Sequence, residues 1–441
     1  MASATHSTAI AALAGAAAAS LAAFLYLRRT SRSTAPSPLT NPGTFVLERF
    51  FAEYEFSAAF QICNSDVSAL TMKELLALCA KDTASIKVWN ELSLGYTESR
   101  GDPTLLAEIA SCYGSSISTG DVLECVPAEG ILLSAQALVE PGDDLIVVWP
   151  AYQSLFEIAR ARGARVHKWT ARGGGAERIH FDVDDLAELC GVAAGTPRAI
   201  KAIVINFPHN PTGAHLTAAE QARVISIARE CGAYVLSDEM YRGLEYAPSH
   251  PTLPPMCEVY EKGISLAGMS KVYALPGLRV GWLVSPAANG FIEACSSLKD
   301  YTTICGSAPS EALALMALRQ RDKLLARSKR IVADGLAAVD AFFARHPNLA
   351  HYHQPMAGPI CYPCFKGAGL GAADVMAYAR SLVAATGVLM LPGGACYDVD
   401  EPHGGGAHFR VGLGRLDIAT NLQEYEKALA DPRFTTCKKA A

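Results

Sequence analysis

Between about residues 90 and 320, short apolar runs alternate with amphipathic stretches, and this alternation constrains the fold more than any other feature. The runs are rich in Val, Ile and Leu: 144-DLIVVW-149, 199-AIKAIVIN-206, 233-AYVLSDE-239, 263-GISLAG-268 and 280-VGWLV-284. Helical patterns lie between them, as in residues 217–232, where Thr217 and Glu220 form a capping box and Gly232 ends the helix. Strands that alternate with helices predict an α/β fold with a mostly parallel sheet covered by helices.

A second, smaller α/β domain is predicted after this region. A long helical pattern follows residue 321, and alternating helices and short strands continue to 407-AHFRVGL-413. Residues 45–85 are also mostly helical in pattern, and 441 residues suit two or three domains. We divide the chain into an N-terminal segment with a linker (1–38), the N-terminal part of the small domain (39–88), a large domain (89–320) and the C-terminal small domain (321–441).

Composition excludes several classes of protein. Half of the residues are hydrophobic and only 18% are charged, which excludes a disordered chain. The net charge is −5 without a basic block, so we predict no nucleic-acid partner. The 13 cysteines are scattered, and the one close pair, Cys361 and Cys364, is a weak redox or metal signal. We interpret them as buried thiols in a reducing compartment and predict no metal site.

The N-terminal segment contains an apolar run from Ala9 to Leu27, AIAALAGAAAASLAAFLYL. At about 1.5 Å per residue, a helix of this run nearly spans a hydrocarbon core of about 30 Å. Arg28, Arg29 and Arg32 follow it, which places them on the cytosolic side. The first prediction is therefore a hydrophobic helix that anchors the protein in a membrane, with the remaining chain facing the cytosol. A cleaved organelle-targeting peptide and a disordered tail are the alternatives.

Polar side chains follow three of the predicted strands. Asn210 comes after the 199–206 run, Asp238 closes the 233–237 run, and Lys271 follows the 263–267 run. In open α/β sheets, ligands bind outside the carboxyl ends of the strands. These three residues therefore predict a ligand site at one edge of the sheet.

Three fragments in this order carry a resemblance: 206-NFPHNPTG-213, 237-SDEMYRGL-244 and 268-GMSKVYALPGLRVGW-282. Together they resemble the fold type I pyridoxal-phosphate enzymes of the aminotransferase class I/II family, over roughly residues 45–430. The resemblance implies pyridoxal 5′-phosphate as the cofactor and amino acids and keto acids as small-molecule partners.

The resemblance implies a catalytic role for Lys271, Asp238 and Tyr241. Lys271 is the Schiff-base lysine, and a desolvated lysine has a lowered pKa that suits it as a nucleophile and a base. Asp238 matches the partner of the pyridine nitrogen, which it keeps protonated. Asn210 and Tyr241 match the residues that hydrogen-bond the phenolic oxygen of the cofactor.

Five further residues match binding positions of the family. Arg279, eight residues after Lys271, binds the phosphate with its bidentate fork, and Ser270 adds a hydroxyl. Tyr152 stacks on the pyridine ring, and Arg410 binds the α-carboxylate of the substrate. Tyr96 resembles the tyrosine that reaches the phosphate of the neighbouring subunit, so we expect a homodimer.

The sequence departs from the family pattern at the phosphate loop. The aligned stretch is 125-CVPAEG-130, where Pro127 has no N–H to donate. Ala128 and Glu129 can still donate through their backbone. Three residues before Lys271, many relatives have a serine, whereas this chain has Gly268.

A second departure lies in 61-QICNSDVSALTMKELL-76, where many relatives are glycine-rich. This stretch loosely resembles the branch that contains capreomycidine synthase, which rearranges a hydroxylated arginine. The likeness makes Ser65, Asp66 and Val67 candidate substrate-side residues, with Asp66 able to pair with a guanidinium or an amine. The alternative is that Ser65 or Asp66 caps a helix.

Three functions stay open from the sequence. The first is an aminotransferase that acts on an L-amino acid through a Schiff base at Lys271 and a quinonoid intermediate. The second is a lyase or cyclase that eliminates a β- or γ-substituent or cyclises an arginine-like substrate. The third is an inactive binding protein with the same fold. The residues that would discriminate are Asp66, Gln153, Tyr273 and the loop around Cys396 and Tyr397.

Overall fold

The computed structural model describes residues 42–400 and 406–439, and a mixed β-sheet lies at its centre. Within these residues the sheet has seven strands in the order β2-β8-β7-β6-β5-β3-β4. The strands are β2 (Val122–Cys125), β3 (Asp144–Trp149), β4 (Arg165–Thr170), β5 (Ala202–Asn206), β6 (Tyr234–Asp238), β7 (Gly263–Gly268) and β8 (Gly281–Val284). The pairs from β4 through β3, β5 and β6 to β7 are all parallel, so the prediction of a mostly parallel sheet is confirmed.

Strand β8 is the exception, since it runs antiparallel to both β7 and β2. The chain passes from Gly268 to Gly281 without the crossover helix that a parallel pair usually needs. Instead, the N–H of Met269 donates to the carbonyl oxygen of Val280 at 3.0 Å and closes the loop. The apolar run at 280–284 is therefore a strand, but a reversed one.

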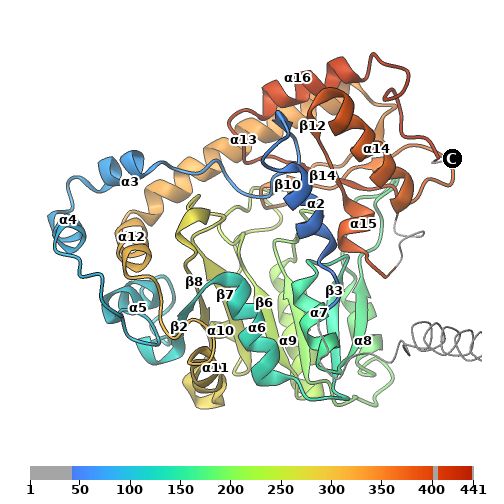
Figure 1. Ribbon diagram of the computed structural model, residues 1–441. Coiled ribbons are helices and arrows are strands. Elements are labelled where there is room, and N and C mark those ends of the chain that lie inside the picture. The colour runs from blue at the N-terminus through green and yellow to red at the C-terminus, as the bar shows by residue number, and fades with distance from the viewer. Residues whose placement is uncertain (1–41, 401–405, 440–441) are drawn as a thin grey trace, which may run out of the picture. The chain divides into compact units, whose positions relative to one another are not determined.

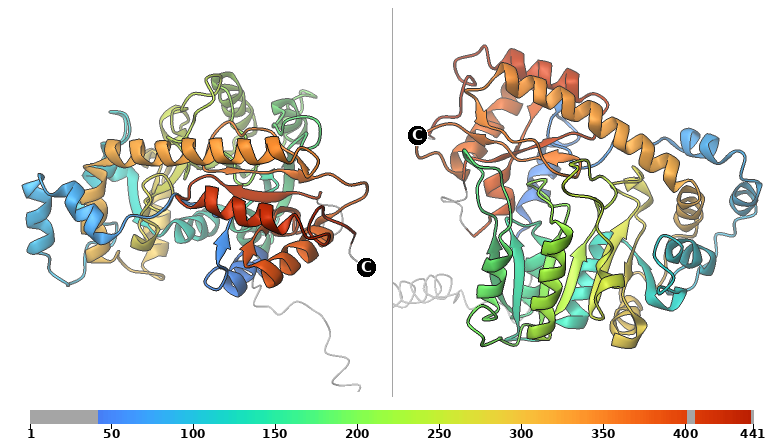
Figure 2. Two further views of the ribbon diagram at one scale, coloured as in Figure 1. Left: turned by 90° about the horizontal axis from the view of Figure 1, so that it is seen from above. Right: turned by 180° about the vertical axis from the view of Figure 1, so that it is seen from behind.

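Alternate residues of the central strands pack into two separate cores. Ile146 and Val148 of β3 pack on one face beneath α8 and α9, whereas Leu145 and Val147 pack on the other beneath α6, α7 and α11. These helices are α6 (Pro127–Leu138), α7 (Ser154–Ala161), α8 (Val183–Leu189), α9 (Ala218–Cys231) and α11 (Phe291–Lys299). Helices thus cover both faces of the sheet, as Figure 1 and the view from behind in Figure 2 show.

Helix α9 forms as its sequence predicts. The hydroxyl of Thr217 accepts a hydrogen bond from the N–H of Glu220, and the Glu220 carboxylate accepts one from the N–H of Thr217. Gly232 ends the helix with φ 68°, a left-handed conformation that glycine adopts without steric cost.

Segments from the two ends of the described chain share another core. Strand β1 (Phe60–Gln61) pairs in parallel with β12 (Val388–Leu389), and Ile62 packs with Phe342, Phe409 and Tyr425. The predicted long helix is α13 (Arg321–Arg345), the orange helix of Figure 1.

The remaining helices are α2 (Val46–Tyr54), α3 (Met72–Cys79), α4 (Thr83–Asn90), α5 (Pro103–Ala110), α10 (Met256–Val259), α12 (Ala308–Leu318), α14 (Ala372–Thr386), α15 (Gly393–Tyr397) and α16 (Ile418–Ala428). The remaining strands are β9 (Ala350–His351), β10 (Ile360–Cys361), β11 (Cys364–Phe365), β13 (Leu391–Pro392) and β14 (Phe409–Gly412). The domain boundaries at residues 38, 88 and 320 stay a prediction.

The predicted localisation needs correction. The apolar run at residues 9–27, on which both the membrane anchor and the targeting peptide were predicted, lies outside the described residues. Among residues 42–400 and 406–439, no helix combines the length and the apolar character that crossing a bilayer requires. The prediction of a membrane-anchored protein is therefore wrong, because its physical basis, an apolar span of about 30 Å, is found in no described helix.

Candidate active site

A cavity of about 610 Å³ lies at the carboxyl ends of the central strands. Its lining includes most of the residues that the sequence singled out: Ser65, Asp66, Ala128, Tyr152, Asn210, Asp238, Tyr241, Ser270, Lys271, Arg279 and Arg410. These residues lie as far apart in the sequence as 65 and 410, so the fold alone brings them together. A volume of this size suits a cofactor together with a small substrate.

The register of the sheet explains why three of them meet. Asp238 is the last residue of β6, and its neighbours across the sheet are Asn206 of β5 and Leu266 of β7. Asn210 and Lys271 follow β5 and β7 after short loops. Parallel strands end at the same edge, so the three side chains reach one cavity, as predicted.

Lys271 is one of the residues that line the cavity. Its Nζ donates a hydrogen bond to Ser65 Oγ at 3.1 Å. Burial lowers the pKa of Lys271, although the carboxylates of Asp66 and Asp238 oppose this effect. A buried amine with a lowered pKa is neutral, and hence nucleophilic, more often than a surface lysine.

Asp238 is buried, with 7% of its surface exposed. Burial raises its pKa to about 6, while the N–H of Met240, 3.2 Å from Oδ1, and the nearby Lys271 act in the opposite direction. A buried carboxylate that has no cation in hydrogen-bond contact is costly, and a protonated ring nitrogen would relieve that cost. The site therefore fits the pyridine end of the cofactor.

Tyr241 and Asn210 lie beside Arg410. Tyr241 is buried, and burial raises the pKa of its phenol to about 12, so it stays protonated and able to donate. Arg410 is also buried, and its Nε donates to the carbonyl oxygen of Cys63 at 2.8 Å. A buried guanidinium that faces a cavity is a fitting partner for a carboxylate.

The other end of the cavity has the donors that a phosphate requires. Pro127 is the first residue of α6, and the N–H of Gly130 bonds to Val126 O, so Ala128 and Glu129 supply the free N–H groups of the first turn. Ser270 and Arg279 also line the cavity. A helix N-terminus, a hydroxyl and an arginine together fit a phosphate.

Three predicted residues, Glu129, Tyr96 and Val67, are not among those that line this cavity, and Val67 is buried in a hydrophobic core. The side chain of Glu129 accepts hydrogen bonds from Thr302 and Thr303, so only its backbone faces the phosphate end. Tyr96 is 92% exposed on a surface loop and does not reach the cavity of its own chain.

Two of the residues that were expected to discriminate between the functions contact other parts of the protein instead of the cavity. Gln153 forms hydrogen bonds with the backbone of Thr44 and Val46, and Tyr273 packs against the hydrophobic core.

Helix α2 and Glu55, the residue that follows it, supply cavity residues that the sequence did not single out. Glu48, Phe51 and Glu55 line the cavity, and Glu48 accepts a hydrogen bond from the hydroxyl of Tyr152 at 3.0 Å. The sequence predicted a helix there, but nothing local indicated that one of its faces would meet the cavity. Asp66 pairs with another unforeseen residue, Arg415, at 3.1 Å.

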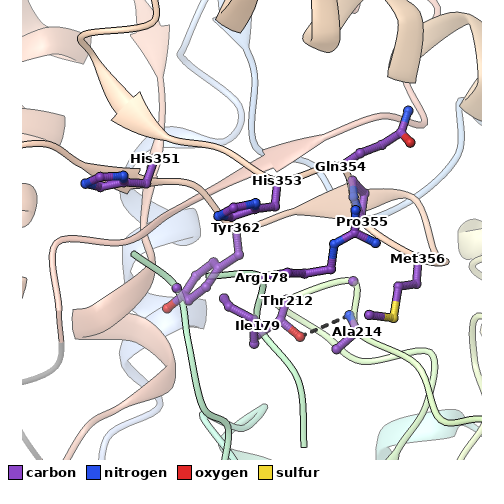
Figure 3. Close-up of a pocket in the computed structure, with 12 residues that line it drawn as sticks. Arg178, Ile179, Thr212, Ala214, His351, His353, Gln354, Pro355, Met356 and Tyr362 are labelled. Atoms are coloured by element: carbon purple, nitrogen blue, oxygen red, sulfur yellow. Dashed lines mark hydrogen bonds between the residues drawn. The ribbon is translucent and has the colours of Figure 1, made fainter. Parts of the chain in front are cut away.

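A much smaller pocket lies away from these residues, between Arg178, Thr212, His353 and Met356 (Figure 3). Its volume is about 20 Å³, which suits a single water molecule rather than a cofactor. The N–H of Ala214 donates to Thr212 Oγ1 at its floor, at 3.1 Å. We therefore locate the candidate active site in the larger cavity.

Comparisons with known proteins identify the family to which the chain belongs. Residues 80–429 match the family described as aminotransferase class I and II. Capreomycidine synthase from Streptomyces vinaceus is 29% identical, over 79% of this chain and 85% of its own length. A PLP-dependent aminotransferase from Streptococcus suis superposes with a TM-score of 0.78 at 27% identity, over 92% of this chain and 100% of its own. The PLP-dependent cyclase OrfR superposes with a TM-score of 0.77 at 25% identity, over 90% of this chain and 99% of its own.

Proposed function

The chain belongs to the class I and II aminotransferases, whose fold is fold type I and whose cofactor is pyridoxal 5′-phosphate, and from this premise we propose that it transaminates an L-amino acid. The observation that carries the proposal is the position of Lys271, a partly buried lysine with a lowered pKa in a cavity that also holds Asp238 and Arg410. An inactive binding protein would not need this combination of a lysine, an aspartate and an arginine in one cavity.

Each residue has a task that its surroundings explain. When bound, the cofactor supplies a reactive aldehyde and a ring that withdraws electrons from the α-carbon of the substrate. Lys271, whose pKa is lowered by burial, takes the α-proton and returns it at a different carbon. Asp238 stabilises positive charge at the ring nitrogen, and Tyr241 donates toward the phenolic oxygen. Arg410 holds the α-carboxylate and so orients the α-proton toward Lys271 Nζ.

The substrate side chain that we propose is cationic. Besides Asp238, three carboxylates line the cavity, those of Glu48, Glu55 and Asp66, and the last of these pairs with Arg415. Burial raises the pKa of Glu55, and the charges of Asp66 and Glu48 raise it further. Asn64 also lines the cavity, is buried, and has a carboxamide oxygen without a hydrogen-bond partner in the described chain. A guanidinium or ammonium in the cavity would relieve the repulsion between these carboxylates.

A second candidate is cyclisation or elimination on an arginine-like substrate. Its support is that two similar proteins, capreomycidine synthase and the cyclase OrfR, carry such names alongside the aminotransferases. The same cavity serves both reactions, because the residues around Lys271 only activate the α-carbon. The step after proton removal differs between the two reactions, so their products discriminate.

We further propose that the protein is a homodimer. Four large apolar side chains are exposed on two loops: Leu94, Tyr96, Tyr301 and Ile304, with Tyr96 and Tyr301 at least nine-tenths exposed. The loops are joined, since Ser99 donates to Asp300 at 3.0 Å. Such a patch favours burial against a second copy, where Tyr96 would complete the phosphate end of the other cavity. Sedimentation of the wild-type protein and of Tyr301→Asp tests this, with dissociation expected in the variant.

The activity is tested with the cofactor-loaded protein in heavy water. Each common amino acid and several arginine derivatives are added, and α-deuterium uptake and products are followed by mass spectrometry. A keto acid together with pyridoxamine phosphate supports transamination and names the donor. Ammonia or a ring product without pyridoxamine phosphate supports the second candidate. A cofactor absorbance band without exchange on any amino acid would contradict both, and Lys271→Ala should abolish exchange under either.

A further inference from the structure

Tyr397 lies behind the cavity and connects two of its polar residues. It ends α15, is completely buried, and is not among the residues that line the cavity. Its carbonyl oxygen accepts a hydrogen bond from the N–H of Ala151 at 3.1 Å, next to Tyr152. Its ring meets that of Tyr362 edge-on, with the centroids 6.4 Å apart. The position of the Tyr397 hydroxyl is therefore fixed by packing on several sides.

The hydroxyl of Tyr397 forms two hydrogen bonds. It donates to Asn210 Oδ1 at 2.9 Å and accepts from Nη1 of Arg410. The same Nη1 lies 3.5 Å from Asn210 Oδ1, so the three groups form a closed triangle. Burial raises the pKa of Tyr397, which keeps the proton that it donates.

This triangle determines the orientation of the Asn210 amide. Its oxygen faces two donors, whereas the flipped amide would set its NH₂ group against the guanidinium of Arg410, donor against donor. The NH₂ group of Asn210 is thereby left for a ligand in the cavity that Asn210 lines. Arg410 uses its Nε on Cys63 and one Nη1 proton on Tyr397, which leaves its Nη2 group for a carboxylate.

We propose that Tyr397 is a positioning residue, whose hydroxyl holds Asn210 and Arg410 in the orientations that binding of cofactor and substrate requires. The inference rests on the proposed function, because it assigns Asn210 to the cofactor and Arg410 to the α-carboxylate. A phenylalanine would fill the same space, so the packing of α15 does not by itself require the hydroxyl. The contribution of the hydroxyl is to orient the side chains of Asn210 and Arg410.

The test compares Tyr397→Phe with a matched control, Tyr378→Phe. Tyr378 is also buried, and its hydroxyl bonds Phe434 O at 2.9 Å and the Tyr425 hydroxyl at 3.0 Å, away from the cavity. Two readouts need no turnover: the Kd of propionate, a carboxylate without an amine, and the pKa of the absorbance band of the bound cofactor. We expect Tyr397→Phe to raise the Kd about 3- to 10-fold and to raise the pKa of the band by about 0.5–1 unit.

The control variant should lose stability but leave both readouts at their wild-type values. Equal Kd and equal band pKa in Tyr397→Phe and Tyr378→Phe would overturn the proposal and leave Tyr397 a packing residue. In turnover, KM should rise more than kcat falls, since the substrate carboxylate loses its preset partner. Failure of the proposed function is separate: a wild-type protein that binds no cofactor shows no band at all, and the role of Tyr397 falls with it.

Discussion

The ring of Pro127 occupies the space into which a side chain on Gly268 would extend. A Cβ on Gly268 would lie 3.1 Å from Cγ of Pro127, 3.0 Å from the carbonyl oxygen of Val280 and 2.9 Å from Cα of Gly281. The two departures from the family pattern therefore meet: the proline at the start of α6 and the glycine at the end of β7 lie against each other, beside the backbone of Val280 and Gly281.

This relationship predicts the effect of restoring the serine that many relatives have. Gly268→Ser should destabilise the protein by about 1–3 kcal/mol, because two of the three contacts are with backbone atoms that cannot move freely. Urea unfolding measures the change. In Pro127→Ala/Gly268→Ser the cost should be smaller than the sum of the single changes, by about 0.5–1 kcal/mol. Additive costs would show that the two residues are independent.

Much of the fold could be predicted from the sequence where burial leaves a local pattern. Strands β3 and β7 match their apolar runs residue for residue, since a strand covered on both faces is continuously apolar. Strands β2 and β4 were not predicted. β2 contains Glu124, whose charge is matched by a lysine 175 residues away, and β4 is a polar edge strand.

The site could be predicted only where residues follow strands directly. Asn210, Asp238 and Lys271 have fixed positions relative to β5, β6 and β7, so their convergence is a consequence of the sheet. Glu55 and Tyr397 reach the site through the packing of α2 and α15, which no local pattern encodes. Tyr96 was predicted to act on the other subunit. Its side chain is exposed, so a single chain cannot show what it would contact there.

Asp238 should lower the free energy of unfolding of the cofactor-free protein. Its pKa is raised by burial to about 6, so above that pH the folded protein holds a buried carboxylate that the unfolded chain would solvate. The contribution of Asp238 to stability is therefore fully present below the pKa that its carboxyl has in the unfolded chain, and it is lost as the pH rises through 6. Asp238→Asn should therefore stabilise the cofactor-free protein by about 1–3 kcal/mol at pH 8, and by almost nothing near pH 4.

Urea unfolding of the two cofactor-free proteins across this pH range measures the difference. The same Asp238→Asn variant should lose most of its activity when loaded, since the ring nitrogen loses its carboxylate partner. A variant that gains no stability at pH 8 would contradict the assignment of a buried, ionised Asp238.

Glu55 should select for a cationic substrate. Glu55→Gln should lower kcat/KM for L-arginine about 10-fold while leaving that for L-norleucine unchanged, because a charged hydrogen-bond acceptor becomes a neutral one. In the wild-type enzyme this preference should weaken as the pH falls through the raised pKa of Glu55. The matched control is Glu53→Gln, two residues earlier on α2, since Glu53 pairs with Arg380 outside the cavity. An equal loss for both substrates would argue against side-chain recognition by Glu55.

The last prediction concerns Lys299, which supports the loop that carries Tyr96. Its Nζ bonds Glu124 Oε2 and the carbonyl oxygen of Ser99, each at 2.9 Å, and the side chains of Lys299 and Glu124 are 0% and 3% exposed. Removing one partner of a buried ion pair leaves the other charge uncompensated, so Lys299→Met should cost about 3–5 kcal/mol.

The pH dependence of that cost identifies its cause. Burial raises the pKa of Glu124 and Lys299 opposes the rise, so in Lys299→Met the pKa should rise further. A carboxyl group with a raised folded pKa loses stability as the pH increases, so the cost should be larger at pH 8 than at pH 5 in urea unfolding. Lys299→Met/Glu124→Gln should regain most of the loss at pH 8, but not all of it, because Ser99 O still lacks its donor. A cost that is the same at both pH values, or a double variant as unstable as the single one, would mean that the uncompensated charge of Glu124 is not its origin.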